Sequence, residues 1–311
     1  MKLAMVFPGQ GSQSVGMLKA YAGLPEVDAV RTQAAAALGA DFLKLLDEGP
    51  AEQLNLTVNT QPAMVTAAIA AYRAWIASGG PAPALVAGHS LGEYSALVAA
   101  GALQFEAALP LVRFRAQAMQ EAVPAGTGAM AAILGLDDDA TRAACAEAAQ
   151  NEIVEAVNFN GPGQVVIAGH KAAVARASEA CKARGAKRAM PLPVSAPFHS
   201  SLLKPAGERL AGYLQNVTLR NPGIQLVNNV DVRIESDPER IKNALVRQAS
   251  SPVRWAETIR AMAAQGVTHV VECGPGKVLA GLVKRIDPNM QGIAAADRAS
   301  LESALAAVKG G

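Results

Sequence analysis

Short apolar runs that end in glycine-rich turns recur along the chain, and helix-forming sequence follows them. The clearest runs span Leu3–Phe7, Ala84–Ala87 and Val267–Val271. Continuous apolar runs of this length are typical of strands that are buried on both faces, as in a parallel sheet. Helices are predicted after two of the runs, over Glu93–Ala100 and Val278–Arg285. The pattern therefore predicts an α/β fold built on a parallel sheet.

The middle of the chain follows another pattern, in which the predicted elements have the order β-α-β-β-α-β. They are the strand Gly128–Leu136, a helix from Asp137-Asp138-Asp139 to about Gln150, the strands Ile153–Asn158 and Gln164–Ala168, the helix Lys171–Arg184 and the strand Ala186–Leu192. This order is ferredoxin-like. We therefore predict an α/β-hydrolase-like large subdomain (residues 1–125 and 197–311) with an inserted ferredoxin-like small subdomain (residues 126–196). The cleft between two subdomains is the expected place for a ligand.

Composition narrows the class of protein. Of the 311 residues 51% are hydrophobic, and the mean hydropathy is +0.19, so a large core is expected and disorder is not. The net charge is only +2, aromatic residues make up 4% and no long basic run occurs, which argues against nucleic-acid binding. Cys145, Cys181 and Cys273 are widely spaced, as reduced thiols of a cytoplasmic protein would be. No apolar run is long enough for a membrane span, and we expect a cytoplasmic monomer.

Gly88-His89-Ser90-Leu91-Gly92 matches the pattern GxSxG, with a predicted strand before it and a predicted helix after it. In that setting a sharp turn exposes the serine hydroxyl, and the amide groups at the start of the helix face the developing oxyanion. The motif alone is common, and a glycine-rich turn with a structural serine is the alternative. The strand–turn–helix setting favours Ser90 as a nucleophile.

A nucleophilic serine needs a base, and the chain has four histidines. His199 lies in a loop where the chain re-enters the large subdomain, so it can reach the cleft. His89 would point away from the serine, His170 follows a strand of the small subdomain, and His269 lies within an apolar run. We choose His199, although the residues alone leave the other three open.

No acidic third member of a triad is predicted. In α/β-hydrolases the acid lies between serine and histidine in chain order. Asp137, Asp138 and Asp139 lie there, but their position at a helix start explains them better as capping residues. We predict a serine–histidine dyad, in which a carbonyl could hold the imidazole.

Two glycine-rich segments fail as nucleotide motifs. A GxGxxG pattern that starts at Gly9 would need glycine at position 14, which is Ser14. Gly274-Pro275-Gly276-Lys277 resembles the end of a P-loop, but Val278 stands where serine or threonine should bind magnesium. The sequence has no HExxH motif and no clustered histidines and cysteines, so neither a cofactor nor a metal is expected.

The motifs together resemble one family, the malonyl-CoA:acyl carrier protein transacylases of fatty-acid synthesis. The segments that carry the resemblance span essentially the whole chain. They are Phe7-Pro8-Gly9-Gln10-Gly11-Ser12-Gln13, Thr60-Gln61-Pro62-Ala63, Gly88-His89-Ser90-Leu91-Gly92-Glu93-Tyr94, Arg115 with Met119-Gln120, Asn158-Phe159-Asn160, Pro197-Phe198-His199, Gln248 and Gly274-Pro275-Gly276.

The resemblance implies a role for each of several residues. Ser90 would be acylated and His199 would move its proton. The main-chain carbonyl of Gln248 would orient the imidazole, and the backbone amides of Gln10 and Leu91 would form the oxyanion hole. The reaction would be ping-pong, from malonyl-CoA to the phosphopantetheine thiol of an acidic acyl carrier protein.

The resemblance also selects Arg115, rather than the nearby Arg113, as the clamp on the malonyl carboxylate. Without the resemblance, the better interpretation of Arg115 is a surface arginine on an otherwise apolar helix. A guanidinium matches a carboxylate with two parallel hydrogen bonds. Phe198 would leave little room for a methyl branch, and Gln61 and Asn160 would line the pocket.

Alternatives remain open at this point. A hydrolase or esterase could use the same Ser90, and an acyltransferase of polyketide synthesis would share the chemistry but use another carrier. A non-catalytic nucleotide-binding or scaffold protein is the alternative from a different class. The basic cluster Lys182, Arg184, Lys187 and Arg188 is a solvated helix end or a docking surface for the carrier.

Overall fold

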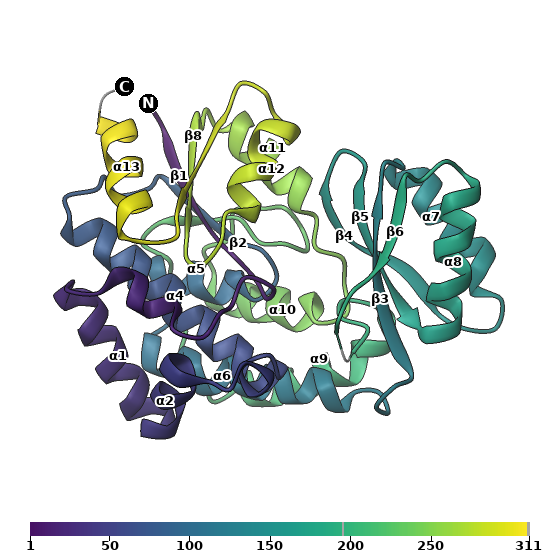
Figure 1. The fold of residues 1–311 in the computed structure, drawn as a ribbon, viewed down its shortest axis with the longest axis horizontal. Helices are drawn as coiled ribbons and strands as arrows, with labels where there is room; N and C mark the ends of the chain where they lie inside the picture. The colour runs from purple at the N-terminus through teal and green to yellow at the C-terminus, as the bar shows by residue number, and fades with distance from the viewer. Residues whose placement is uncertain (195, 310–311) are drawn as a thin grey trace.

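The computed structural model describes residues 1–194 and 196–309, which form two α/β parts, each with its own sheet (Figure 1). The strands of the described residues are β1 (Leu3–Phe7), β2 (Leu85–Gly88), β3 (Gly128–Leu134), β4 (Val154–Gly161), β5 (Gln164–His170), β6 (Arg188–Pro191), β7 (Gln225–Leu226), β8 (His269–Cys273) and β9 (Gln291–Ala295).

Helices pack against both sheets. The α-helices of the described residues are α1 (Pro25–Leu38), α2 (Ala40–Glu48), α3 (Ala51–Leu54), α4 (Thr57–Ala77), α5 (Gly92–Ala99), α6 (Phe105–Glu121), α7 (Asp138–Ala149), α8 (Lys171–Ala183), α9 (Lys204–Leu214), α10 (Pro238–Gln248), α11 (Trp255–Ala264), α12 (Val278–Ile286) and α13 (Arg298–Lys309). The short 3-10 helices are η1 (Met17–Tyr21) and η2 (Ser201–Leu203). Among the described residues, no helix combines the length and apolar character that crossing a membrane requires.

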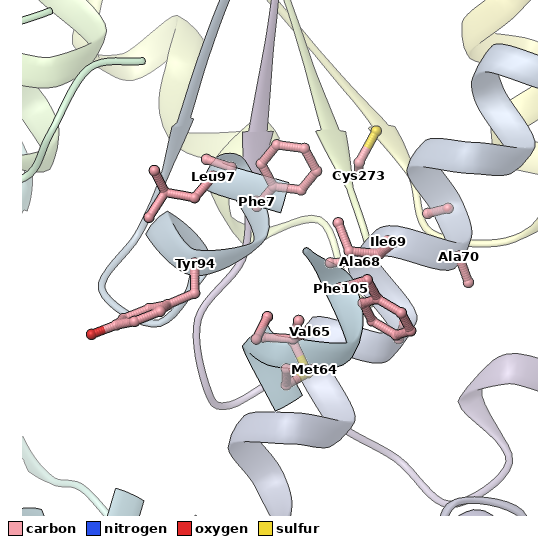
Figure 2. Packing of buried hydrophobic residues seen from close by; sticks show 14 of the residues in the cluster. Phe7, Met64, Val65, Ala68, Ile69, Ala70, Tyr94, Leu97, Phe105 and Cys273 are labelled. Atoms are coloured by element: carbon pink, nitrogen blue, oxygen red, sulfur yellow. The ribbon is translucent and has the colours of Figure 1, made fainter. Parts of the chain in front are cut away.

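The first sheet has the strand order β7-β2-β1-β8-β9, and its neighbouring strands run parallel. Alternate residues of β1 face different cores. Met5 and Phe7 pack with α4, α5 and α6, whereas Ala4 and Val6 pack with α11 and α12. In Figure 2 the side chains of Phe7 and Cys273, from the neighbouring strands β1 and β8, lie over α4. Both faces are covered, which confirms the parallel α/β sheet that the continuous apolar runs predict.

The second sheet is antiparallel, with the strand order β4-β5-β3-β6, and α7 and α8 cover the face that points away from the first sheet (Figure 1). Asp137 caps α7 by accepting a hydrogen bond from the backbone N–H of Ala140 at 2.8 Å, which confirms its predicted place at a helix start. The order β-α-β-β-α-β of the ferredoxin-like part is confirmed, and its strands fall within residues 126–196. The exact boundaries of the two subdomains stay a prediction.

A small apolar cluster joins the two parts beside the cleft. It combines Met119 of α6 with Met130 of β3, Val166 of β5, Phe198 and Leu203. The carboxyl ends of β1 and β2 point toward this junction, so the turn after β2 faces the small subdomain. Since ligands of open α/β sheets bind outside the carboxyl ends of the strands, the fold places the candidate site here.

Candidate active site

Ser90 lies in the turn between β2 and α5, where its backbone is in the left-handed region with φ 51°. The glycines on either side are required by close packing. A Cβ at Gly88 would lie 1.8 Å from the carbonyl carbon of Gly92, and a Cβ at Gly92 would lie 2.0 Å from the carbonyl oxygen of Phe7. A positive φ at a non-glycine residue is strained and persists only where the surroundings fix it. The structure thus has the sharp strand–turn–helix setting that the GxSxG pattern predicts.

The side-chain amide of Asn229 holds this turn from both sides. Its Oδ1 accepts a hydrogen bond from the backbone N–H of Ser90 at 2.7 Å, and its Nδ2 donates one to the carbonyl of Gly88 at 2.7 Å. Asn229 is fully buried, so these bonds are not exchanged with water. Asn229 is not predicted from the sequence, since it lies 139 positions after Ser90 in a turn whose sequence has no catalytic pattern.

Ser90 and His199 form a hydrogen-bonded pair that is held by a main-chain carbonyl. The Oγ of Ser90 lies 2.6 Å from Nε2 of His199, and Nδ1 of His199 lies 2.8 Å from the carbonyl oxygen of Gln248. A carbonyl only accepts hydrogen bonds, so the proton of the neutral ring lies on Nδ1 and Nε2 is free to accept the serine proton. The structure brings together the serine, the histidine and the carbonyl chosen from the sequence. Of the other three histidines, His89 is hydrogen-bonded through Nε2 to Oδ1 of Asn160, while His170 and His269 lie on β5 and β8.

The imidazole of His199 is poised as a neutral base. Burial lowers its pKa to about 3, with a further contribution from the nearby cation of Arg115, while the hydrogen bond to the Gln248 carbonyl acts in the opposite direction. Only 4% of the residue is exposed. A base is active when it is unprotonated, so His199 can accept a proton throughout the neutral range.

We expect the ring of His199 to stay neutral when the free protein is titrated from pH 8 to pH 4.5. Nitrogen chemical shifts of the imidazole, recorded by NMR, measure this directly. Arg115→Ala should raise the pKa, because it removes a neighbouring positive charge. In the unfolded chain the ring takes up its proton near pH 6.5, whereas in the folded protein it does so near pH 3, so folding stability should fall as the pH falls through that window. A midpoint near 6.5 in the folded protein would contradict the assignment.

Arg115, on α6, places a buried cation beside the serine. Only 1% of the residue is exposed, and its Nη2 donates hydrogen bonds to Oγ of Ser90 at 3.2 Å and to Oε1 of Gln248 at 2.9 Å. Its Nη1 donates to Oε1 of Gln61 at 2.9 Å, and the guanidinium lies 5.4 Å from the centre of the Tyr94 ring. These neighbours are neutral, and no carboxylate of the described residues forms an ion pair with it. Burial lowers the pKa of Arg115, because the charged guanidinium is poorly solvated there. A carboxylate from a ligand would stabilise this buried charge.

The structure gives the two neighbouring arginines of α6 different surroundings. Arg113 is partly exposed and lies over the ring of Phe42 at 5.6 Å, on another side of α6. Arg115 instead reaches the serine and Gln61. Helical geometry explains the difference, since residues two positions apart point to different sides of a helix.

Two backbone N–H groups are available beside the serine. Leu91 lies at the start of α5, and Gln10 lies in the loop after β1. Neither N–H group donates to another group of the described residues. The loop is held against the turn, since a Cβ at Gly9 would lie 2.9 Å from the carbonyl oxygen of His89, and Oε1 of Gln10 accepts from Nε2 of Gln61 at 3.0 Å.

A cavity of about 130 Å³ opens above these groups, between the large part and the small one. Its wall includes Arg115 and Phe198, as well as Asn158 and Met130 of the second sheet. Asn160 is not among the described residues that line it. Its Oδ1 accepts a hydrogen bond from Nε2 of His89 at 2.8 Å. Side chains alternate in direction along a strand, but register irregularities in β4 between Ala156 and Asn158 and between Phe159 and Gly161 make the direction of each side chain hard to predict from sequence.

Comparisons with known proteins define the class first. The model of the family described as the acyl transferase domain matches residues 4–299, so the chain belongs to the acyl transferase domain family. The malonyl CoA-acyl carrier protein transacylase of Escherichia coli K12 is 55% identical to the chain over 305 residues, 98% of this chain and 99% of that protein. The protein of the same name from Bacillus subtilis 168 is 45% identical over 310 residues, with 99% and 98% covered. Within the family, the chain groups with malonyl CoA-acyl carrier protein transacylases.

Solved structures agree in sequence and in shape. The acyl-carrier-protein S-malonyltransferase of Burkholderia pseudomallei 1710b is 64% identical, with a TM-score of 0.96 and 98% and 99% of the two chains covered. A malonyl-transacylase solved in complex with a type II polyketide acyl carrier protein is 53% identical, also with a TM-score of 0.96, and 98% and 99% are covered. The shared fold therefore extends over both parts of the molecule.

Proposed function

We propose that the protein transfers the malonyl group of malonyl-CoA to the phosphopantetheine thiol of an acyl carrier protein, through a malonyl ester on Ser90. The observation that carries the proposal is the distance of 3.2 Å between Nη2 of Arg115 and Oγ of Ser90. In a malonyl thioester a single methylene separates the reacting carbonyl from the carboxylate. When the carbonyl reaches Oγ, the carboxylate must therefore lie close to a cation that contacts the nucleophile, so the two can form an ion pair.

The first half-reaction acylates the serine. Oγ of Ser90 attacks the thioester carbonyl while Nε2 of His199 takes the hydroxyl proton, and the backbone N–H groups of Gln10 and Leu91 stabilise the oxyanion. The carbon–sulfur bond then breaks, and His199 returns the proton to the thiolate of coenzyme A. The carbonyl of Gln248 stabilises the charged imidazole that exists between these two steps.

The second half-reaction reverses the same steps with another thiol. The phosphopantetheine thiol loses its proton to Nε2 of His199 and attacks the malonyl ester. The carbon–oxygen bond of the ester breaks, and Ser90 recovers the proton from His199. Coenzyme A leaves before the carrier thiol reacts, and the malonyl group stays on Ser90 in between, so the transfer is ping-pong.

Selectivity for malonyl over acetyl follows because a neutral acyl group brings no counter-ion for Arg115. An acetyl group would leave the cation of Arg115 buried without a counter-ion, and an uncompensated buried charge costs about 3–5 kcal/mol. Gln61 would hold the guanidinium from the other side. Phe198 borders the cavity and would leave little room for the methyl branch of methylmalonyl.

The names of the relatives support both partners, malonyl-CoA and an acyl carrier protein. One related structure holds a polyketide carrier, so the alternative of a polyketide acyltransferase concerns the carrier and not the chemistry. We propose the carrier of fatty-acid synthesis. Arg188 and Met190 of the edge strand β6 are exposed and precede Leu192 and Val194 of the cavity wall, which supports the basic cluster as the side from which an acidic carrier approaches.

The protein is proposed to work in the cytoplasm as a monomer, without a metal or an organic cofactor, and to bind neither nucleic acid nor membrane. Its catalytic subdomain is taken as residues 1–125 and 197–311, and the small subdomain as residues 126–196. The three cysteines are buried and unpaired, in agreement with reduced thiols.

The proposal predicts that release of coenzyme A depends on the carrier protein. Without a carrier, one equivalent of coenzyme A per protein molecule should be released rapidly from malonyl-CoA, after which release should slow sharply. With phosphopantetheinylated carrier protein, release should continue until malonyl carrier protein has formed. A stopped-flow thiol assay measures both phases. Equally fast continuous release with and without the carrier would make the protein a thioesterase.

A further inference from the structure

A buried carboxylate that the mechanism does not use lies one turn beyond the nucleophile. Glu93, on α5, is 0% exposed. Its Oε2 accepts hydrogen bonds from Nε2 of Gln248 at 2.8 Å and from the backbone N–H of Asn229 at 3.0 Å, while its Oε1 has no hydrogen-bond partner among the described residues. Burial raises the pKa of Glu93 to about 7. A carboxyl group is costly to bury, so its place here calls for an explanation.

Glu93 contacts the side chain of Gln248, which in turn contacts several other parts of the site. Oε1 of Gln248 accepts from Nη2 of Arg115 at 2.9 Å, and Nε2 of Gln248 donates to the carbonyl of Ser90 at 3.1 Å as well as to Glu93. The backbone carbonyl of the same residue holds His199 at 2.8 Å. One glutamine therefore contacts the nucleophile, the base and the cation.

Chemistry fixes which way this amide points. A guanidinium only donates hydrogen bonds, so the amide oxygen of Gln248 must face Arg115, and its NH2 group must face acceptors. Glu93 supplies the shorter of the two acceptor contacts, at 2.8 Å against 3.1 Å for the carbonyl of Ser90. If Glu93 withdrew, the NH2 group would lose that contact and the amide would be free to tilt away from the cation.

We infer that Glu93 is a positioning residue for Arg115: through the side-chain amide of Gln248, it fixes the place of the guanidinium relative to Oγ of Ser90. The inference rests on the proposed function, since its consequence is the recognition of the malonyl carboxylate. What matters is an acceptor atom at the right place, so glutamine at position 93 can serve and aspartate cannot. Aspartate keeps the carboxylate but withdraws it by about one carbon–carbon bond, about 1.5 Å.

Two small substitutions separate position from charge. Glu93→Gln keeps an oxygen acceptor for Gln248 and for the N–H of Asn229, while Glu93→Asp keeps the carboxylate and loses the reach. The matched control is Glu272→Asp. Glu272 on β8 is also 0% exposed, accepts a hydrogen bond from the backbone N–H of Ala280 at 2.8 Å and has no partner for Oε1 among the described residues, but it lies outside the site.

The experiment measures kcat/KM for acylation by malonyl-CoA and by acetyl-CoA, and thermal unfolding of each protein. Glu93→Asp should lower the malonyl-to-acetyl ratio by about 10–100-fold, as expected when a substrate-positioning group is displaced by about 1 Å. Glu93→Gln should keep the ratio within about threefold of the wild type, because it retains an oxygen acceptor for the NH2 group of Gln248. Glu272→Asp should lower the unfolding temperature and leave the ratio unchanged.

Three results would overturn the inference: an unchanged ratio in Glu93→Asp, a loss in Glu93→Gln as large as in Glu93→Asp, or an equal change in Glu272→Asp. The first would show that the reach of the side chain does not matter, the second that a retained acceptor is not sufficient, and the third that the ratio follows stability in general. Failure of the proposed function would look different, because the wild-type protein would then form no malonyl ester on Ser90 at all.

Discussion

Ser90→Ala is expected to abolish malonyl transfer, with kcat lower by at least about 10⁴-fold, as in other serine enzymes that lose their nucleophile. The reason is geometric: Oγ is the atom that lies 2.6 Å from the base and 3.2 Å from the cation. Alanine fits the turn, so the fold should be kept. Formation of malonyl carrier protein, followed by gel shift or mass spectrometry, measures the loss.

The control for this substitution is Ser95→Ala. Ser95 lies on the same helix α5 and is 1% exposed, but it is outside the cavity wall. Transfer by Ser95→Ala should stay within a few-fold of the wild type. If Ser90→Ala kept substantial transfer, the nucleophile would be another residue.

Arg115→Ala is expected to lower kcat/KM for malonyl-CoA by roughly 200- to 5,000-fold, which corresponds to about 3–5 kcal/mol for breaking a buried ion pair. Acetyl-CoA has no carboxylate, so its acylation rate should fall much less and the malonyl-to-acetyl ratio should collapse. The ratio is the decisive measurement, because a general loss of folded protein lowers both rates equally. Arg115→Lys should recover only part of the ratio, since an ammonium cannot form the bidentate contact.

Arg113→Ala is the matched control, since its guanidinium lies over Phe42 and not in the cavity wall. It should leave the ratio unchanged. An unchanged ratio in Arg115→Ala would show that Arg115 does not bind the carboxylate, and malonyl selectivity would need another source.

Much of the fold is visible in the sequence, since strands buried on both faces show as unbroken apolar runs. The central strands β1 and β2 were predicted for this reason, and β8 to within two residues. The edge strands β7 (Gln225–Leu226) and β9 (Gln291–Ala295) were not predicted. The first has only two residues, and the second is mostly alanine and glycine, so neither differs clearly from a loop.

The candidate site was predictable where local sequence defines it. The turn around Ser90 carries its own signature, and the place of Arg115 and Gln248 came from the family resemblance. The sequence indicates no role for Glu93 or Asn229. Glu93 is hydrogen-bonded to Gln248, 155 positions away, and to the backbone N–H of Asn229, 136 positions away, and contacts at such separations are not visible in the sequence. The partners of a buried polar residue depend on the folded structure. Asn160, for example, is hydrogen-bonded to His89 and is not among the described residues of the cavity wall.

Intact-mass spectrometry after brief mixing with equal amounts of malonyl-, methylmalonyl- and acetyl-CoA tests the central claim most directly. We expect one adduct per molecule, with the mass of a malonyl group, which peptide mapping places on Ser90 and which disappears when phosphopantetheinylated carrier protein is added. Arg115 would account for the exclusion of acetyl, and Phe198 for that of methylmalonyl. The absence of any adduct, an adduct on another residue, or an acetyl adduct as abundant as the malonyl one would contradict this account of the site.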